Sequence, residues 1–256
     1  MLHRPADGGT IVIGQPAHAW VSGQIARAWA EPFQPREEVC LAADQHDIAW
    51  VGWERSPEWD PTTGLPYTFS ALPRRRRLEL WSGAATLLLP QSRYAALLVS
   101  LHGTLLVERF PPGGDEDVRR ALADYLERER DFQARVLESL RGDRRYGAHA
   151  TPEAVERNRE LIFTWDGLSL ALLHGVRGEK AAVGHTLAPL DGDPTRVTVS
   201  PWPFRRDEVT LSCDGRLLTE TFADERELRR GLAKAAWTTI ETRLSPREPV
   251  SAGADP

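Results

Sequence analysis

Residues 36–53 read REEVCLAADQHDIAWVGW. Apolar-face positions recur here at the four- and three-residue spacing of an α-helix: Val39, Ala43, His46, Trp50 and Trp53. The stretch therefore predicts an amphipathic helix that buries His46 beside Asp47. An unpaired carboxylate in such surroundings costs several kcal/mol of desolvation, and a bound cation removes that cost.

Three more side chains of metal-ligand type fall in apolar surroundings elsewhere in the chain. His18 lies in a helical pattern that begins at Pro16, and His102 lies four residues after Leu98 in a second such pattern. Asp166 is the lone carboxylate of the run LIFTWDGLSLALL at 161–173, so it needs a positive partner. One divalent cation would serve all of these groups.

The order His18, His46-Asp47, Asp166 resembles the signature of the HD superfamily of metal-dependent phosphohydrolases. The resemblance implies a helical bundle with each motif member on a different helix, and a second metal position at His102. The whole chain also resembles a bacterial family of unknown function. Its members share three phrases: Gln15-Pro16-Ala17-His18-Ala19, His46-Asp47 with Trp50, and Asp166 with Leu168-Ser169-Leu170.

The fold expected from these patterns is mainly α: an HD-like helical bundle with a small C-terminal element that contains a β-hairpin, and a final helix. Strand-like alternation occurs at 196–200 and 209–212, and Asp214-Gly215 has the composition of a hairpin turn. The final helix is expected from about 224 to 243. This divides the chain into a helical metal-binding body at 1–180, a small α+β element packed on it at 181–244, and a disordered tail at 245–256.

Composition excludes several classes of protein. A formal charge of −5 over 256 residues argues against binding of a nucleic-acid backbone, with residues 74–77, all arginine, as a local exception. Cys40 and Cys213 form no CxxC pair, so neither a disulfide framework nor a thiolate zinc site is expected. No stretch is apolar enough to span a membrane or to form a signal-peptide core, which predicts a soluble, cytoplasmic protein with no membrane partner. No feature indicates an oligomeric state.

Residues 56–73 are rich in proline and aromatic side chains, a composition that forbids a long helix but can still pack as an ordered loop. Because this loop follows the His-Asp pair, it is expected either to form a lid or wall of the site or to pack as an irregular segment.

The function predicted from these features is hydrolysis of a phosphorylated small molecule, such as a nucleotide, by a divalent metal (Mn, Fe, Zn or Mg). His18, His46, Asp47 and Asp166 would hold the ion, which lowers the pKa of a bound water. His102 would bind a second ion or the phosphate. Asp47 or Glu54 would orient the water or accept its proton. The arginines at 74–77 are candidate phosphate contacts, with Arg74 and Arg75 as the expected ones. Trp50 and Trp53 are the expected contacts for a base, although tryptophans also serve core packing.

Two other functions fit the same sequence. Myo-inositol oxygenase shares the HD-type scaffold, so a di-iron oxygenase is one alternative. The other is a non-catalytic protein that binds a ligand or partner through a degenerate site. A hydrolase predicts phosphoester turnover, an oxygenase predicts bound iron and oxygen uptake, and a binder predicts neither.

Overall fold

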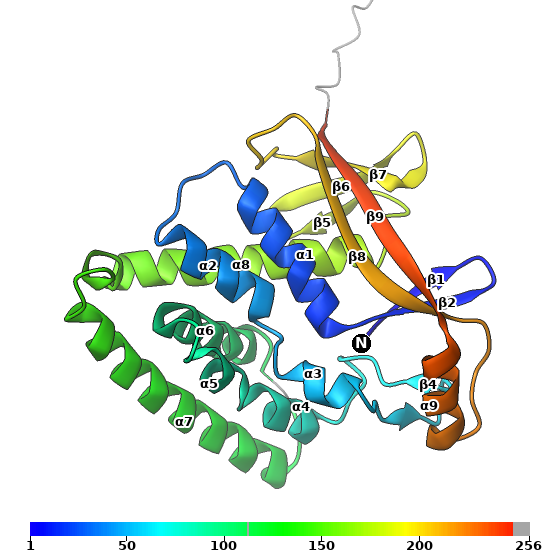
Figure 1. The fold of residues 1–256 in the computed structure, drawn as a ribbon, viewed down its shortest axis with the longest axis horizontal. Helices are drawn as coiled ribbons and strands as arrows, with labels where there is room; N and C mark the ends of the chain where they lie inside the picture. Colours follow the sequence, from blue (N-terminus) through cyan, green and yellow to red (C-terminus); the bar gives the residue numbers. More distant parts are fainter. Residues whose placement is uncertain (112, 248–256) are drawn as a thin grey trace, which may run out of the picture.

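The fold is built around one curled, seven-stranded sheet that forms a half-barrel against a layer of helices (Figure 1). This computed structural model describes residues 1–111 and 113–247. The strand order is β1-β2-β8-β9-β7-β6-β5. The bounds are β1 (Leu2–Ala6), β2 (Gly9–Ile13), β5 (Lys180–Ala182), β6 (His185–Leu190), β7 (Asp193–Ser200), β8 (Val209–Leu218) and β9 (Ala236–Pro246). Neighbouring strands are antiparallel except β7 and β9, which run parallel.

The expectation of a mainly α, all-helical body is wrong, because the chain is about 49% helical and 22% strand and has an α/β fold. The predicted hairpin turn at Asp214-Gly215 is one source of the error. Both residues lie inside β8, where Gly215 pairs with Thr238 of β9. A side chain at Gly215 would collide with Ile11 of β2, so this glycine permits close approach of a strand instead of a turn.

The predicted final helix is also corrected. Helix α9 (Glu225–Lys234) ends ten residues into the expected stretch, and β9 follows after Ala235. The sequence AWTTIETRLSP of β9 is rich in β-branched residues, which favour strands over helices. Strand β9 extends through Pro246, into the expected tail, whose residues 248–256 lie outside the described residues.

The remaining elements are two short strands and the other helices of the described residues. They are α1 (Gln15–Ala28), α2 (Arg36–Gln45), α3 (Trp50–Glu54), β3 (Trp59–Asp60), β4 (Leu65–Pro66), α4 (Arg74–Trp81), α5 (Ala84–Leu88), α6 (Arg93–Arg109), α7 (Glu116–Arg141), a 3₁₀ helix (Gly147–His149) and α8 (Pro152–Leu173). Thr151 caps α8 through its hydroxyl, with Pro152 in the first turn, as the sequence predicts.

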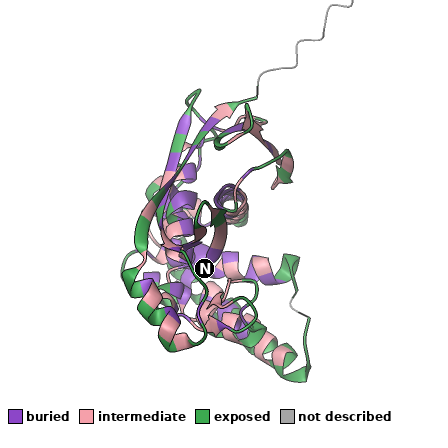
Figure 2. Cartoon of the chain, turned by 90° about the vertical axis from the view of Figure 1, so that its right-hand side faces the viewer, coloured by how far each residue is buried: buried purple, intermediate pink, exposed green. Residues whose placement is uncertain are grey.

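Helix α1 connects the two layers of the fold. It contacts β8 of the sheet on one side and α2 and α8 on the other (Figure 1). Ile13 and Leu211 from the sheet share one apolar core with Ile25, Leu98 and Trp165 from the helices. The buried residues gather where sheet and helices meet (Figure 2). Within the described residues, no helix has the length and apolar character needed to cross a membrane.

Candidate metal centre

The chain turns at His46 and Asp47. Helix α2 ends at Gln45, residues 46–49 form a turn, and α3 begins at Trp50, so the single helix expected over 36–53 is interrupted. Consecutive side chains on a helix point about 100° apart. The turn instead lets both side chains face one point, with His46 Nε2 and Asp47 Oδ2 3.7 Å apart.

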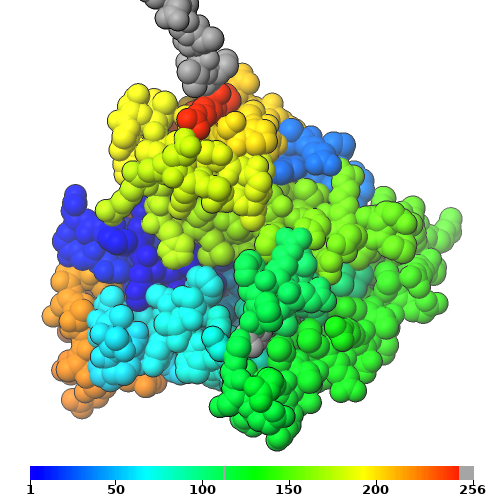
Figure 3. All heavy atoms as spheres, turned by 180° about the vertical axis from the view of Figure 1, so that it is seen from behind, coloured from blue at the N-terminus to red at the C-terminus, as the bar shows by residue number. Residues whose placement is uncertain are grey.

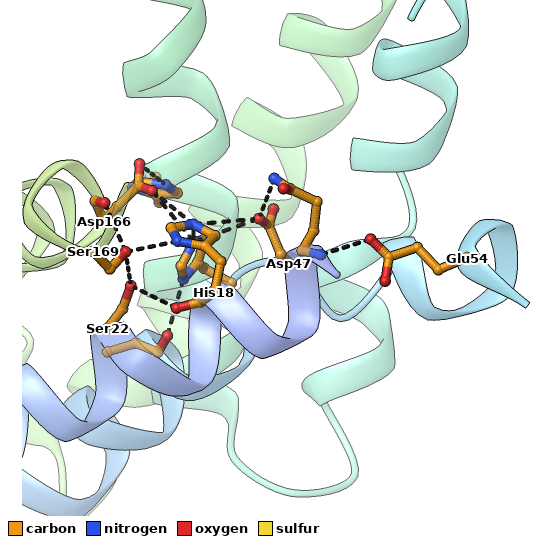
Figure 4. A network of polar contacts seen from close by, with 10 residues as sticks. His18, Ser22, Asp47, Glu54, Asp166 and Ser169 are labelled. Atoms are coloured by element: carbon orange, nitrogen blue, oxygen red, sulfur yellow. Dashed lines mark hydrogen bonds and ion pairs between the residues drawn. The ribbon is translucent and has the colours of Figure 1, made fainter. Parts of the chain in front are cut away.

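Four side chains from three separate segments converge at this point (Figure 4). His18 of α1 places its Nε2 3.2 Å from His46 Nε2 and 3.7 Å from Asp47 Oδ2. Asp166 of α8 places Oδ1 3.0 Å from His18 Nε2 and 3.6 Å from His46 Nε2. All four residues are buried. Ligands at about 2.0–2.2 Å from one ion lie about 3.0–3.5 Å from each other, so this cluster could hold a metal.

The hydrogen bonds of the two histidines leave both Nε2 atoms facing inward. His46 Nδ1 lies 2.9 Å from the carbonyl oxygen of Ala43, which can only accept, so Nδ1 carries the hydrogen. His18 Nδ1 lies 2.6 Å from Ser169 Oγ, and the Ser169 hydroxyl donates to the carbonyl of Asp166 at 2.8 Å. When the hydroxyl donates its one hydrogen to this carbonyl, it accepts from His18 Nδ1. In their neutral forms, both histidines present a bare Nε2 lone pair to the cluster.

The electrostatics of the cluster favour positive charge. Burial lowers the pKa of His46, but the carboxylates of Asp47 and Asp166 outweigh it and raise that pKa to about 9. Burial raises the pKa of Asp166, but the histidines His102, His18 and His46 outweigh it and hold that pKa well below its usual range. The two carboxylates and the imidazoles thus form a site that stabilises a proton or a metal cation.

His102 of α6 adds a fifth ligand-type side chain. Its Nε2 lies 3.4 Å from Asp166 Oδ2, and its ring lies edge-on to that of His46 with centroids 5.0 Å apart. Neither ring nitrogen has a hydrogen-bond partner among the described residues, although the side chain is buried. A buried imidazole without a partner is costly, so His102 offers a free ligand atom. His46, His102 and Asp166 form a second group that could hold an ion.

The cluster opens into a cavity of about 350 Å³. Of the predicted substrate contacts, Trp50 and Arg74 line this cavity together with Phe69 of the proline-rich loop. The surface is hollowed where the cyan segment, the green segment and the yellow-green end of α8 meet (Figure 3). The loop at 56–73 therefore contributes a wall to the cavity.

Three of the predicted site residues lie away from the ligand cluster. Glu54 accepts a hydrogen bond from the backbone N–H of Gln15 at 2.6 Å and lines a different cavity, and burial raises its pKa to about 7. Trp53 packs against Trp50 and donates its indole N–H to Glu58. Arg75 is exposed and forms ion pairs with two acidic residues, Asp117 and Glu79.

Sequence reasoning assigned no role to two residues that orient the cluster. Gln15 donates its side-chain N–H to Asp47 Oδ2 at 3.0 Å, and Ser169 orients His18. Arg77 lines the cavity. The phrases quoted above already contain Gln15 and Ser169, beside His18 and Asp166. Arg77 belongs to the arginine run 74–77, which the sequence indicates as candidate phosphate contacts, and it lies one turn after Arg74.

Comparison with protein-family models finds one described as "Protein of unknown function (DUF3891)", which matches residues 1–220. Comparisons with curated proteins and with solved structures give no match. The matched stretch contains all five ligand-type residues of the cluster and the sheet strands through β8. Since it spans most of the 256 residues, the chain belongs to the DUF3891 family, whose function is unknown.

Proposed function

We propose that the protein is a metal-dependent hydrolase of phosphorylated small molecules, with one divalent ion held by His18, His46, Asp47 and Asp166. One observation carries this proposal. The bare Nε2 atoms of His18 and His46 lie 3.2 Å apart, and carboxylate oxygens lie at 3.0–3.7 Å from them. Two Nε2 lone pairs at this distance repel unless a proton or a metal cation lies between them, and the two carboxylates favour either one.

The ligand atoms of the site restrict which metal ions it would prefer. Imidazole nitrogens with carboxylate oxygens and no thiolate suit Mn, Fe or Zn, and Mg is the weakest fit because it prefers oxygen ligands. When bound, such an ion lowers the pKa of a coordinated water and polarises a phosphoryl oxygen. The order of His18, His46-Asp47 and Asp166 along the chain matches the HD superfamily signature, whereas the α/β fold differs from the helical bundle that this resemblance implies.

The chain's own residues orient these groups. Gln15 fixes one oxygen of Asp47, and Ser169 fixes the ring of His18. Asp47 is the residue we assign to orient the attacking water and accept its proton, because it belongs to the cluster and Glu54 does not. His102, which faces Asp166 with both ring nitrogens free, is the residue we assign to a second ion or to the substrate phosphate.

A di-iron oxygenase is a second candidate function. His102 Nε2 and Asp166 Oδ2, which lie 3.4 Å apart, support it, because they could help to hold a second ion beside the first. The identity of the bound metal and oxygen uptake distinguish the two functions.

The test combines metal content by mass spectrometry with turnover of 4-nitrophenyl phosphate in the presence of Mn. We expect a stoichiometric metal and turnover in the wild type, and loss of both in His46→Ala and Asp166→Ala. His149→Ala is the matched control, since this histidine lies outside the cluster and contacts Tyr94 only through its backbone carbonyl. Circular dichroism verifies folding of each variant. Absence of metal after reconstitution would refute the proposal, and metal without turnover would leave a binding protein.

A further inference from the structure

Helix α4 carries four consecutive arginines that face two different surroundings. Arg75 pairs with Asp117 and Glu79, and Arg76 pairs with Glu58 and Glu79, so the charge of both is neutralised on the outside of the molecule. Arg74 and Arg77 lie three residues apart and therefore share the other face of the helix. Both line the cavity into which the ligand cluster opens.

The two cavity arginines have no carboxylate partner among the described residues. Arg74 donates only to the carbonyl oxygen of Gly113. Arg77 is half-buried, and its Nε is buried without a hydrogen-bond partner. Burial lowers the pKa of the Arg77 guanidinium, which remains charged. A half-buried guanidinium that lines a cavity and has no carboxylate partner is a candidate site for the anionic group of a ligand.

The rest of the cavity wall is apolar. It includes Leu78, Trp81, Leu106, Phe110, Phe163 and Leu170. Phe110 is 66% exposed and stacks on Phe163 with ring centroids 6.3 Å apart, so the apolar surface continues to the solvent. Apart from the ligand cluster, the polar groups of the lining residues are those of Gln15 and the two arginines and the indole N–H groups of Trp50 and Trp81. Sugar hydroxyls or the edge of a nucleobase would lose hydrogen bonds to water here and regain few.

We propose that the substrate is an amphiphilic phosphoester whose compact apolar body, aromatic or aliphatic, fills the cavity and whose anionic group pairs with Arg77, assisted by Arg74. The phosphoester part of this inference rests on the proposed function, and the selection of an apolar anion does not. A volume of about 350 Å³ is near the lower limit for small-molecule sites, which suits a body of about two fused rings.

The test is calorimetric titration of the full chain with four ligands, two of which are phosphonates that cannot be hydrolysed. The ligands are 1-naphthylphosphonate, methylphosphonate without the apolar body, 1-naphthalenemethanol without the charge, and AMP. We expect 1-naphthylphosphonate to bind at least about tenfold more tightly than each of the others. Arg77→Gln should weaken its binding about tenfold or more, whereas Arg75→Gln, on the same helix but facing outward, should change it less than about twofold.

Arg77→Lys keeps the positive charge and tests the proposal if Arg77→Gln fails to fold. This variant should bind 1-naphthylphosphonate more weakly than the wild type does and more tightly than any neutral variant at position 77. Equal binding of methylphosphonate or AMP, or equal effects at positions 75 and 77, would overturn the inference. These outcomes are separable from those of the hydrolase test. Selective binding without phosphoester turnover refutes only the proposed function, and turnover without selectivity for the apolar anion refutes only this inference.

Discussion

His18 Nε2 lies 3.2 Å from His46 Nε2, with the two rings nearly perpendicular at 85°. Each ring is fixed from behind, His18 through Ser169 and His46 through the carbonyl of Ala43. This arrangement aims both nitrogens at the oxygens of Asp47 and Asp166. The consequences for protons, for metal binding and for folding can each be measured.

Metal binding should release a proton at neutral pH. Without metal, burial lowers the pKa of His46 but its carboxylate neighbours raise it to about 9, above the ordinary 6.5. The folded metal-free chain therefore holds this proton more tightly than the unfolded chain. The resulting stabilisation is complete below pH 6.5 and is lost as the pH rises through about 9.

A histidine must be neutral to bind a metal, so the affinity for Mn or Zn should rise between pH 7 and pH 9. Calorimetry in two buffers of different ionisation enthalpy measures the released proton. An equal heat of metal binding in both buffers at pH 7 would mean that no proton is released, and this would contradict a protonated His46.

Ser169→Ala should weaken metal binding about 10- to 100-fold, because it removes the hydrogen bond that orients His18. It should also cost about 1–3 kcal/mol of stability, because it leaves a buried imidazole nitrogen unpaired. Metal titration monitored by competition with a chelator provides the affinity. Thr164→Ala is the matched control, since its hydroxyl lies on the same helix and bonds only to the carbonyl of Glu160. Equal affinities of the two variants would show that Ser169 does not position the ligand.

Glu54→Gln should leave phosphoester turnover within about twofold of wild type, since Glu54 contacts the backbone of Gln15 and lines another cavity. Turnover of 4-nitrophenyl phosphate measures this effect. A loss of about tenfold or more would restore the catalytic role that the sequence predicts for this residue.

The same substitution should change the pH dependence of stability. Burial raises the pKa of Glu54 from 4.5 to about 7. The wild type therefore loses stability relative to Glu54→Gln as the pH rises from 4.5 through about 7. Urea unfolding at pH 5 to 8 measures the difference, with exposed Glu37→Gln as control. A difference independent of pH would refute the raised pKa.

Sheet and helices should unfold together, because Leu211 of β8 and Trp165 of α8 belong to one core. Leu211→Ala should cost about 2–5 kcal/mol of unfolding free energy. Its exposed neighbour Thr210→Ala should cost less than about 1 kcal/mol. Tryptophan fluorescence and circular dichroism should report one transition with the same midpoint. Two separate transitions would favour the division at residue 180 that the sequence suggests.

The sequence by itself determined the chemistry of the candidate centre and much of the helical layer. Ligand-type side chains in apolar runs, such as Asp166, are costly without a partner wherever the chain places them, so composition and local periodicity are enough to single them out. Helix ends are local too, which is why the cap at Thr151 could be predicted from a few residues.

Only the tertiary structure decided the sheet, the turn at His46 and the direction of each arginine. Strand β2 pairs with β8 some 200 residues later, and no local pattern encodes such a partner; the turn-like Asp214-Gly215 is held straight by β9. Arg75 and Arg77 have the same chemistry, but Arg75 forms ion pairs with carboxylates of α7 and α4. Arg77 instead lines the largely apolar cavity. Local sequence sets which groups need partners, whereas packing of distant segments sets which partners they meet.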